Sequence, residues 1–270
     1  MTIQNIQDVE MFLINRFSRL FPAFWVSVTL TYITVNLFGP ENRAVDFTTY
    51  IINLSMVHEF IGVAHIDGVY WSLSIELIFY FWMATLLLSN NLNKILKILI
   101  ALHILCFLAL SPTFPKILSQ LLILKYLPFF SLGICIYQIS LGKKTILLTL
   151  LVMSSIAYTL LAYNILHSTI LIVAILYFLL RTKYNFRANK ILLFLGSISY
   201  PLYLIHQNIG YSLLINSYKN GFPPLIAILA ALLISIGLAT IIHTYIEKPF
   251  GKKMKTTLKN AAWKSHHLKP

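Results

Sequence analysis

Charged residues are scarce in this sequence, and acidic residues are scarcer than basic ones. Only 11% of the 270 residues are charged and 58% are hydrophobic, whereas a typical soluble domain has about 25% charged residues. This shortage excludes an ordinary soluble domain and predicts a protein of the lipid bilayer. The net charge of +13 comes from basic residues in short loops and in a C-terminal tail. That distribution is typical of membrane topology, so we expect no nucleic-acid partner.

Cysteines and the common catalytic motifs are also missing or nearly so. The two cysteines, Cys106 and Cys135, each lie inside an apolar run, which indicates neither a disulfide framework nor a metal site. The sequence has no glycine-rich phosphate loop, zinc-ligand spacing, GxSxG elbow, heptad array or repeat. The chemistry must therefore come from polar residues placed within or beside the apolar runs.

Long apolar runs dominate what is present. A transmembrane helix needs about 20 mostly apolar residues, and eight candidates occur, near 20–39, 69–88, 95–111, 117–140, 145–162, 168–180, 190–217 and 223–245. We therefore predict an all-α, polytopic membrane helix bundle with about eight transmembrane helices. The brief polar break at 164–168 predicts a tight hairpin between the fifth and sixth spans.

Prolines give a first indication of where these helices begin. Six of them fall at or near predicted helix starts or in connections, where a missing N–H is tolerated: Pro22, Pro112, Pro115, Pro201, Pro223 and Pro224. The exception is Pro128, which lies inside the fourth predicted span. We expect a kink there.

Basic residues give the orientation. With eight spans, 17 of the 21 lysines and arginines fall on one side of the membrane, which places both termini in the cytoplasm. The chain then divides into a cytoplasmic leader at 1–19, a transmembrane domain at 20–247 and a basic cytoplasmic tail at 248–270. Four of the eight acidic residues gather in the single long outside loop, namely Glu41, Asp46, Glu59 and Asp67.

One carboxylate lies within the second span. In the segment HIDGVYWSLSIELIFYFW, residues 65–82, Ser72, Glu76 and Tyr80 share one helix face. A carboxylate facing lipid costs several kcal/mol, so Glu76 should point into the bundle or into a wet cavity. We favour a site role, and a buried packing residue remains the alternative. Asp67 lies just before the helix near the outer interface, as a loop residue or a helix cap.

A second polar group lies within the predicted span at 190–217. In GSISYPLYLIHQ, residues 196–207, Tyr203 and His206 share a stripe with Ser199. His206 is a candidate for proton transfer or only for a hydrogen bond to a neighbouring helix.

Basic residues stand at both ends of the transmembrane domain. Arg16 and Arg19 lie one turn apart before the first span. They either orient the chain in the membrane and contact lipid headgroups, or they bind phosphate groups. At the other end, Glu247 beside Lys248 is typical of a solvated helix end.

Four segments, taken in order, resemble motifs of the acyltransferase 3 family of integral membrane O-acyltransferases. FLINRFSRLFPAFW is similar to the family's R-x-x-R-[IL]-x-P segment, and DGVYWSLSIELIFY to its W-[ST]-L-[SA]-x-E helix. LGSISYPLYLIHQ is similar to its L-G-x-x-S-Y-x-L-Y-L-x-H segment, and YIEKPF to its E-[KR]-P terminus. Each motif alone is weak, but four in order over residues 12–250 make the resemblance strong.

The resemblance implies an O-acyltransferase of the bacterial plasma membrane. Such an enzyme moves an acyl group, most often acetyl, from acetyl-CoA or another acyl-CoA to a sugar hydroxyl of a cell-surface polysaccharide or related glycan. The implied partners are the lipid bilayer, the acyl-CoA donor substrate and the glycan acceptor, with no bound cofactor. The family has ten spans, of which this sequence carries the last eight. We expect the first two helices, with the histidine taken to be catalytic, to be missing.

The resemblance also implies roles for the residues singled out above. Glu76 would orient a base histidine, and Tyr203 and His206 would donate hydrogen bonds to the developing oxyanion. Arg16 and Arg19 would bind the donor phosphates. The remaining residues, Asp67, Trp71 and Ser72, would contact the acceptor.

Two other functions stay open at this stage. One is a transporter or flippase of lipid-linked glycans, which is disfavoured because the two halves lack paired discontinuous segments. The other is an N-terminally truncated, inactive member of the family. A start codon assigned too late, or a separate polypeptide that supplies the two helices, would instead preserve activity.

Overall fold

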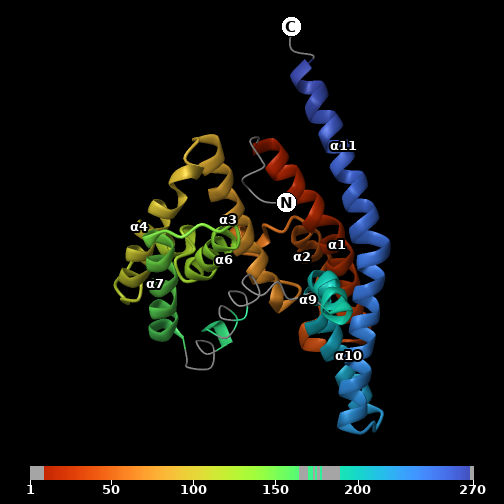
Figure 1. The fold of residues 1–270 in the computed structure, drawn as a ribbon. Coiled ribbons are helices and arrows are strands. Elements are labelled where there is room, and N and C mark those ends of the chain that lie inside the picture. Colours follow the sequence, from red (N-terminus) through yellow and green to blue (C-terminus); the bar gives the residue numbers. More distant parts are fainter. Residues whose placement is uncertain (1–8, 164–169, 173, 175–176, 178–188, 268–270) are drawn as a thin grey trace. The chain divides into compact units, whose positions relative to one another are not determined.

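All regular structure in the described part of the chain is helical. A computed structural model describes residues 9–163, 170–172, 174, 177 and 189–267, and no strand occurs among them (Figure 1). The predicted sixth span at 168–180 and the hairpin at 164–168 lie largely outside these residues. The chain forms two compact units, one from Met1–Leu77 with Asn189–Pro270 and the other from Ile78–Ala188. The all-α prediction is therefore confirmed.

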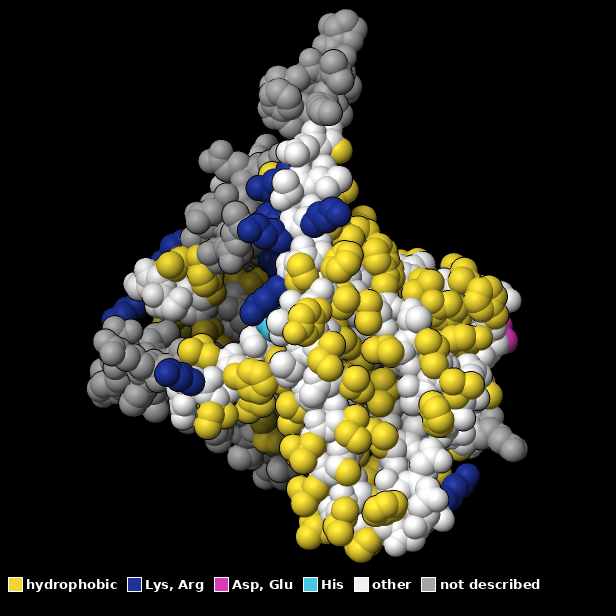
Figure 2. Space-filling model, turned by 90° about the vertical axis from the view of Figure 1, so that its right-hand side faces the viewer, with side chains coloured by type: hydrophobic (Ala, Val, Ile, Leu, Met, Phe, Trp, Pro, Cys, Tyr) yellow, Lys and Arg dark blue, Asp and Glu magenta, His cyan; other side chains and the backbone are white. Residues whose placement is uncertain are grey.

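Three helices in the described residues are long and apolar enough to cross a bilayer. They cover Val9–Phe38, Gly68–Leu88 and Pro224–Ala262, and they match the predicted spans at 20–39, 69–88 and 223–245. The first part of the third, helix α10 (Pro224–Ile241), exposes many apolar side chains, and hydrophobic side chains spread over the lower part of Figure 2. The exposed large residues of α10 include Leu225, Ile226, Ile228, Leu229, Leu232, Leu233 and Ile234. An exposed apolar surface of this kind suits contact with lipid.

Helix α1 (Val9–Phe38) and helix α9 (Lys190–Lys219) run side by side in the first unit. The Tyr200 hydroxyl donates to the Leu20 carbonyl at 3.0 Å. Sixteen residues further along α9, Asn216 Nδ2 donates to the Phe38 carbonyl at 2.6 Å. Because both contacts occur in the same order along the two helices, α1 and α9 point in the same direction.

The C-terminal helix of the first unit returns to α1. Helix α10 (Pro224–Ile241) packs on α9 and continues through the π-helix η6 (Ile242–Glu247) into α11 (Lys248–His267). Both η6 and α11 contact α1. The basic tail predicted at 248–270 is thus helical over its described part.

The segment after α1 turns back along that helix. The ring of Tyr50, in α2 (Phe47–Asn53), stacks on Tyr32 with centroids 4.5 Å apart. The Trp25 indole then donates to the Leu54 carbonyl at 3.0 Å. Trp25 lies about 20 Å from Phe38 along α1 at 1.5 Å per residue. Aromatic and hydroxyl side chains on α1 therefore hold this segment against the middle of that helix.

Two short helices connect this segment to α3. They are η3 (His58–Ile61) and η4 (Gly68–Tyr70), with η2 (Glu41–Arg43) preceding them, and α3 covers Trp71–Leu88. The Tyr70 ring packs edge-on against Phe24, with centroids 5.4 Å apart. Helix α3 therefore begins level with the middle of α1.

Pro115, Pro223 and Pro224 stand at helix starts as predicted, but three other prolines differ from the sequence-based expectation. Pro22 and Pro201 lie inside α1 and α9, whereas Pro128 stands at the start of α6 (Leu127–Ser140). The predicted span at 117–140 is accordingly two helices, since α5 (Lys116–Leu121) ends before a turn in which Ile123 has φ 48°. A proline at the first helical turn needs no N–H, so the chain begins a new helix there and does not kink.

A buried histidine connects three helices of the second unit. They are α4 (Ile95–Leu108), which follows η5 (Leu92–Lys94), then α6 and α7 (Ile146–Ala162). His103 Nδ1 lies 2.6 Å from Ser154 Oγ, and His103 Nε2 lies 3.0 Å from Ser131 Oγ. Both ring nitrogens of His103 therefore take part in hydrogen bonds between packed helices.

Candidate functional site

A basic pocket lies between α1 and the η6–α11 segment. Its volume is about 430 Å³. It is lined by Asn15, Arg16, Ser18, Arg19, Glu247, Lys248, Gly251, Lys252 and Lys255. Five of these side chains are basic and one is acidic, so the pocket suits an anionic ligand.

A close crossing of α1 and α11 forms the floor of this pocket. Pro22 has no N–H to bond the Ser18 carbonyl four residues earlier, and that oxygen lies against Gly251. A Cβ atom added to Gly251 would stand 2.8 Å from Ser18 O. The helices approach this closely because glycine has no side chain there.

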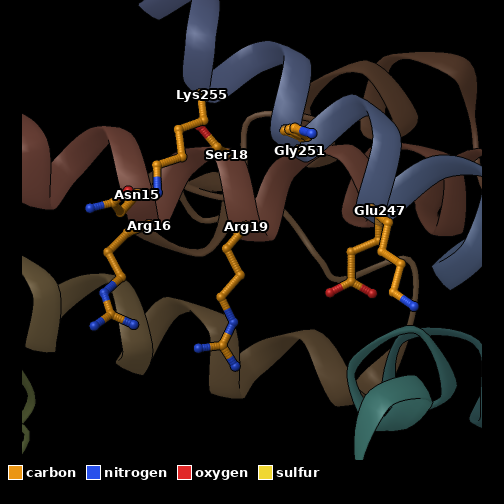
Figure 3. Close-up of a pocket in the computed structure, with 9 residues that line it drawn as sticks. Asn15, Arg16, Ser18, Arg19, Glu247, Gly251 and Lys255 are labelled. Atoms are coloured by element: carbon orange, nitrogen blue, oxygen red, sulfur yellow. The ribbon is translucent and has the colours of Figure 1, made fainter. Parts of the chain in front are cut away.

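The arginine pair lies on one face of α1, as predicted from its spacing. Figure 3 shows that the side chains of Arg16 and Arg19 extend from α1 in the same direction. Two guanidinium groups in this arrangement can form bidentate hydrogen bonds with phosphate oxygens. Both residues lie within α1, which begins at Val9 and continues through them without a break.

The carboxylate of the pocket is held by a histidine. His243 Nδ1 donates to Glu247 Oε2 at 2.7 Å, and the two side chains are only 11% and 17% exposed. The pair lies in the π-helix η6, a helix form that occurs often at functional sites. The expectation that Glu247 marks a solvated helix end is therefore wrong.

A second polar cluster joins the start of α3 to α9. The Tyr203 hydroxyl donates to the Val69 carbonyl at 2.6 Å and lies 2.6 Å from Ser72 Oγ. Glu76 is half-buried one turn after Ser72 and interacts electrostatically with the Tyr203 phenol. The structure thus brings together three of the predicted residues, Ser72, Glu76 and Tyr203. Because Tyr70 packs on Phe24, this cluster begins about 8 Å from Arg19 along α1.

Comparison with known families decides the broad identity. A model of an acyltransferase domain, the acyltransferase 3 family model, matches residues 4–244. The chain belongs to the acyltransferase 3 family. No curated protein matches it, and no solved structure does. Family membership together with the apolar helices makes it a membrane acyltransferase in general.

In this acyltransferase, Asp67 connects the segment before α3 to α9. Its side chain is fully buried and accepts hydrogen bonds from the backbone N–H groups of Asn208 at 3.0 Å and Val69 at 3.2 Å. Burial raises the pKa of Asp67 above its ordinary value, although both hydrogen bonds oppose the change. Asp67 therefore caps the short helix η4, which is one of the two roles that the sequence allowed. Its contact with an acceptor stays a prediction.

Two residues that were not predicted from the sequence, Asn208 and Arg43, also hold this segment against α9. Asn208 Nδ2 donates to the Ile66 carbonyl at 2.6 Å, and Asn208 Oδ1 accepts a hydrogen bond from the Arg43 guanidinium. Arg43 also lies over the ring of Tyr211, 4.4 Å from its centroid. No local sequence pattern indicates that Arg43 has a partner 165 residues away.

The remaining predicted residues lie nearer the surface of the acyltransferase. His206 is exposed, and its Nδ1 lies 2.9 Å from the Tyr203 carbonyl of its own helix. Trp71 is 41% exposed. Catalytic and acceptor roles for these two residues stay predictions. Within the described residues, no group of three His, Cys, Asp or Glu side chains is placed to hold a metal ion.

Proposed function

We propose that this chain is an O-acyltransferase that moves an acyl group, most often acetyl, from acyl-CoA to a sugar hydroxyl of a cell-surface polysaccharide or related glycan. The observation that carries the proposal is the basic pocket, in which five basic side chains surround a single carboxylate. Arg16 and Arg19 would bind the donor phosphates as bidentate forks. The bias of basic residues in the sequence favours a cytoplasmic position for this pocket.

The cluster around Tyr203 is the proposed place of acyl transfer. In the reaction, the sugar oxygen attacks the thioester carbonyl, a base takes the hydroxyl proton, and the CoA thiolate leaves. Glu76 would orient and charge-stabilise the base, and Tyr203 and His206 would donate to the oxyanion. Tyr203 must then exchange its hydrogen bond to Val69 for one to the substrate. The separation of about 8 Å along α1 between Arg19 and this cluster favours one donor molecule that reaches both places.

Donor binding tests the proposal directly. The purified chain in lipid nanodiscs is titrated with acetyl-CoA by calorimetry, and release of the CoA thiol is followed when glycan acceptors are added. Replacing both arginines (Arg16→Ala with Arg19→Ala) should weaken donor binding at least about tenfold, since each removes charge-assisted hydrogen bonds. The matched control is Lys253→Ala, on α11 but outside the pocket lining. Equal affinity of the arginine variant and the wild type would refute a donor site here.

A further inference from the structure

Two lysines of the pocket lie beyond the segments that carry the family resemblance. The match to the family ends at residue 244, and the E-K-P segment ends at Pro249. Lys252 and Lys255 follow on α11 and line the pocket together with Lys248. Their spacing at i, i+4 and i+7 places the three lysines on one face of the helix. Lys253, on the same helix, is exposed and does not line the pocket.

The pocket is electrically uneven along its length. Figure 3 shows Lys255 reaching toward Asn15 and Arg16 on α1, whereas Glu247 stands at the opposite end, nearer Arg19. Lys255 is about 12 Å from Glu247 along the helix axis at 1.5 Å per residue. One end of the pocket therefore combines lysine with arginine, and the only carboxylate of the lining lies at the other end.

The basic charge exceeds what a diphosphate requires. The planar guanidinium groups of Arg16 and Arg19 suit the paired oxygens of a diphosphate, whereas lysine ammonium groups act as point charges. A phosphate monoester adds about −1.5 to −2 charges near neutral pH. Lys252 and Lys255 supply two further positive charges, of which Lys255 lies at the end away from Glu247, and this charge matches one such group.

We propose that Lys252 and Lys255 bind a phosphate monoester at the nucleotide end of the acyl donor. They would make the enzyme selective for CoA thioesters, which carry a 3′-phosphate, over donors that lack this group. This inference rests on the proposed function, because it assigns a subsite within the donor pocket. The phosphate of an anionic lipid headgroup has the same chemistry, and the experiment separates the two sources.

The test compares CoA with 3′-dephospho-CoA as calorimetric ligands of the full chain in phosphatidylcholine nanodiscs. The wild type should bind CoA at least about tenfold more tightly, the range of one or two charge-assisted contacts. The double variant Lys252→Ala with Lys255→Ala should bind CoA only as well as dephospho-CoA, with its affinity for dephospho-CoA unchanged. Lys253→Ala should keep the full preference. Thermal melting of each variant checks that it remains folded.

Three results would overturn the inference. Equal binding of both ligands by the wild type, or an equal loss for both ligands in the double variant, removes the monoester subsite while the donor site stands. A preference that disappears when phosphatidylglycerol is included in the nanodiscs assigns the lysines to lipid headgroups. If neither ligand binds the wild type, the donor pocket itself is refuted, and the proposed function fails together with the subsite.

Discussion

Tyr203 donates a hydrogen bond to the carbonyl of Val69 across 134 residues of sequence, with the two oxygens 2.6 Å apart. This contact, with Ser72 beside it, fixes the start of α3 against α9. Tyr203→Phe should lower the free energy of unfolding by about 1 kcal/mol, the usual net value of one such bond. It should also lower the turnover number without changing donor affinity. Thermal unfolding and calorimetric titration of the purified variant check both effects.

Ser72→Ala separates the two effects of Tyr203. This variant removes a neighbour of the phenol but leaves its bond to Val69 in place, so turnover should fall much less than in Tyr203→Phe. If both variants lose stability and turnover in the same proportion, Tyr203 acts only in packing.

Glu76 is expected to be required for transfer but not for donor binding. Glu76→Gln keeps the size of the side chain but removes the charge that would stabilise a protonated base, and it replaces one acceptor oxygen with an NH2 donor. Release of CoA thiol in the presence of acceptor should fall below detection, whereas acetyl-CoA should bind with unchanged affinity. The comparison is made in a preparation whose wild-type rate has first been measured. Normal turnover would reduce Glu76 to a packing residue.

A pair of histidines should make stability depend on pH. His58 Nε2 lies 2.7 Å from His65 Nδ1, and Glu59 lies 3.9 Å from the other nitrogen of His65. Burial, followed by the nearby His65, lowers the pKa of His58 from 6.5 to about 4. The unfolded chain therefore takes up a proton below about pH 6.5 that the folded chain refuses until about pH 4. The stability that the neutral His58 contributes is therefore fully present above pH 6.5 and is lost as the pH falls toward 4.

His58→Gln tests this assignment. Glutamine retains a donor near the position of Nε2 but does not titrate. Melting temperatures of the variant measured from pH 7.5 to pH 4.5 should fall less steeply than those of the wild type. Parallel curves for the two proteins would show that other groups cause the acid loss.

The helices were predictable where local pattern alone decides them. The run at 69–88 and the shared face of Arg16 and Arg19 both follow from hydropathy and spacing, and the structure agrees with them. Pro223 and Pro224 stand at a helix start as their sequence context predicts, whereas Pro22 and Pro201 lie inside helices. Pro22 is tolerated inside α1 beside Gly251 of another helix, a partner that no local pattern contains.

The missed parts of the site share one physical cause. Trp25 bonds Leu54, and Asp67 bonds Asn208, through contacts between segments distant in sequence. Such contacts give a single sequence no periodic signal. Lys255 was counted as part of a basic tail, because lysine spacing alone does not distinguish a pocket face from a solvated one. Only the crossing of α11 over α1 separates the two.

That crossing gives the last prediction. Gly251→Ala would place a Cβ atom 2.8 Å from the backbone oxygen of Ser18, and a backbone atom cannot rotate away as a side chain does. The helices must separate, so we expect a loss of about 1–3 kcal/mol in stability and weaker CoA binding as the pocket widens. Gly237→Ala in α10 is the matched control, since no atom lies within 4 Å of its added Cβ, and alanine there should be neutral or stabilising by up to about 1 kcal/mol. Thermal melting and CoA titration of the two variants test this prediction. Equal melting temperatures and equal CoA affinities of both variants would show that the close approach of Gly251 to α1 is dispensable.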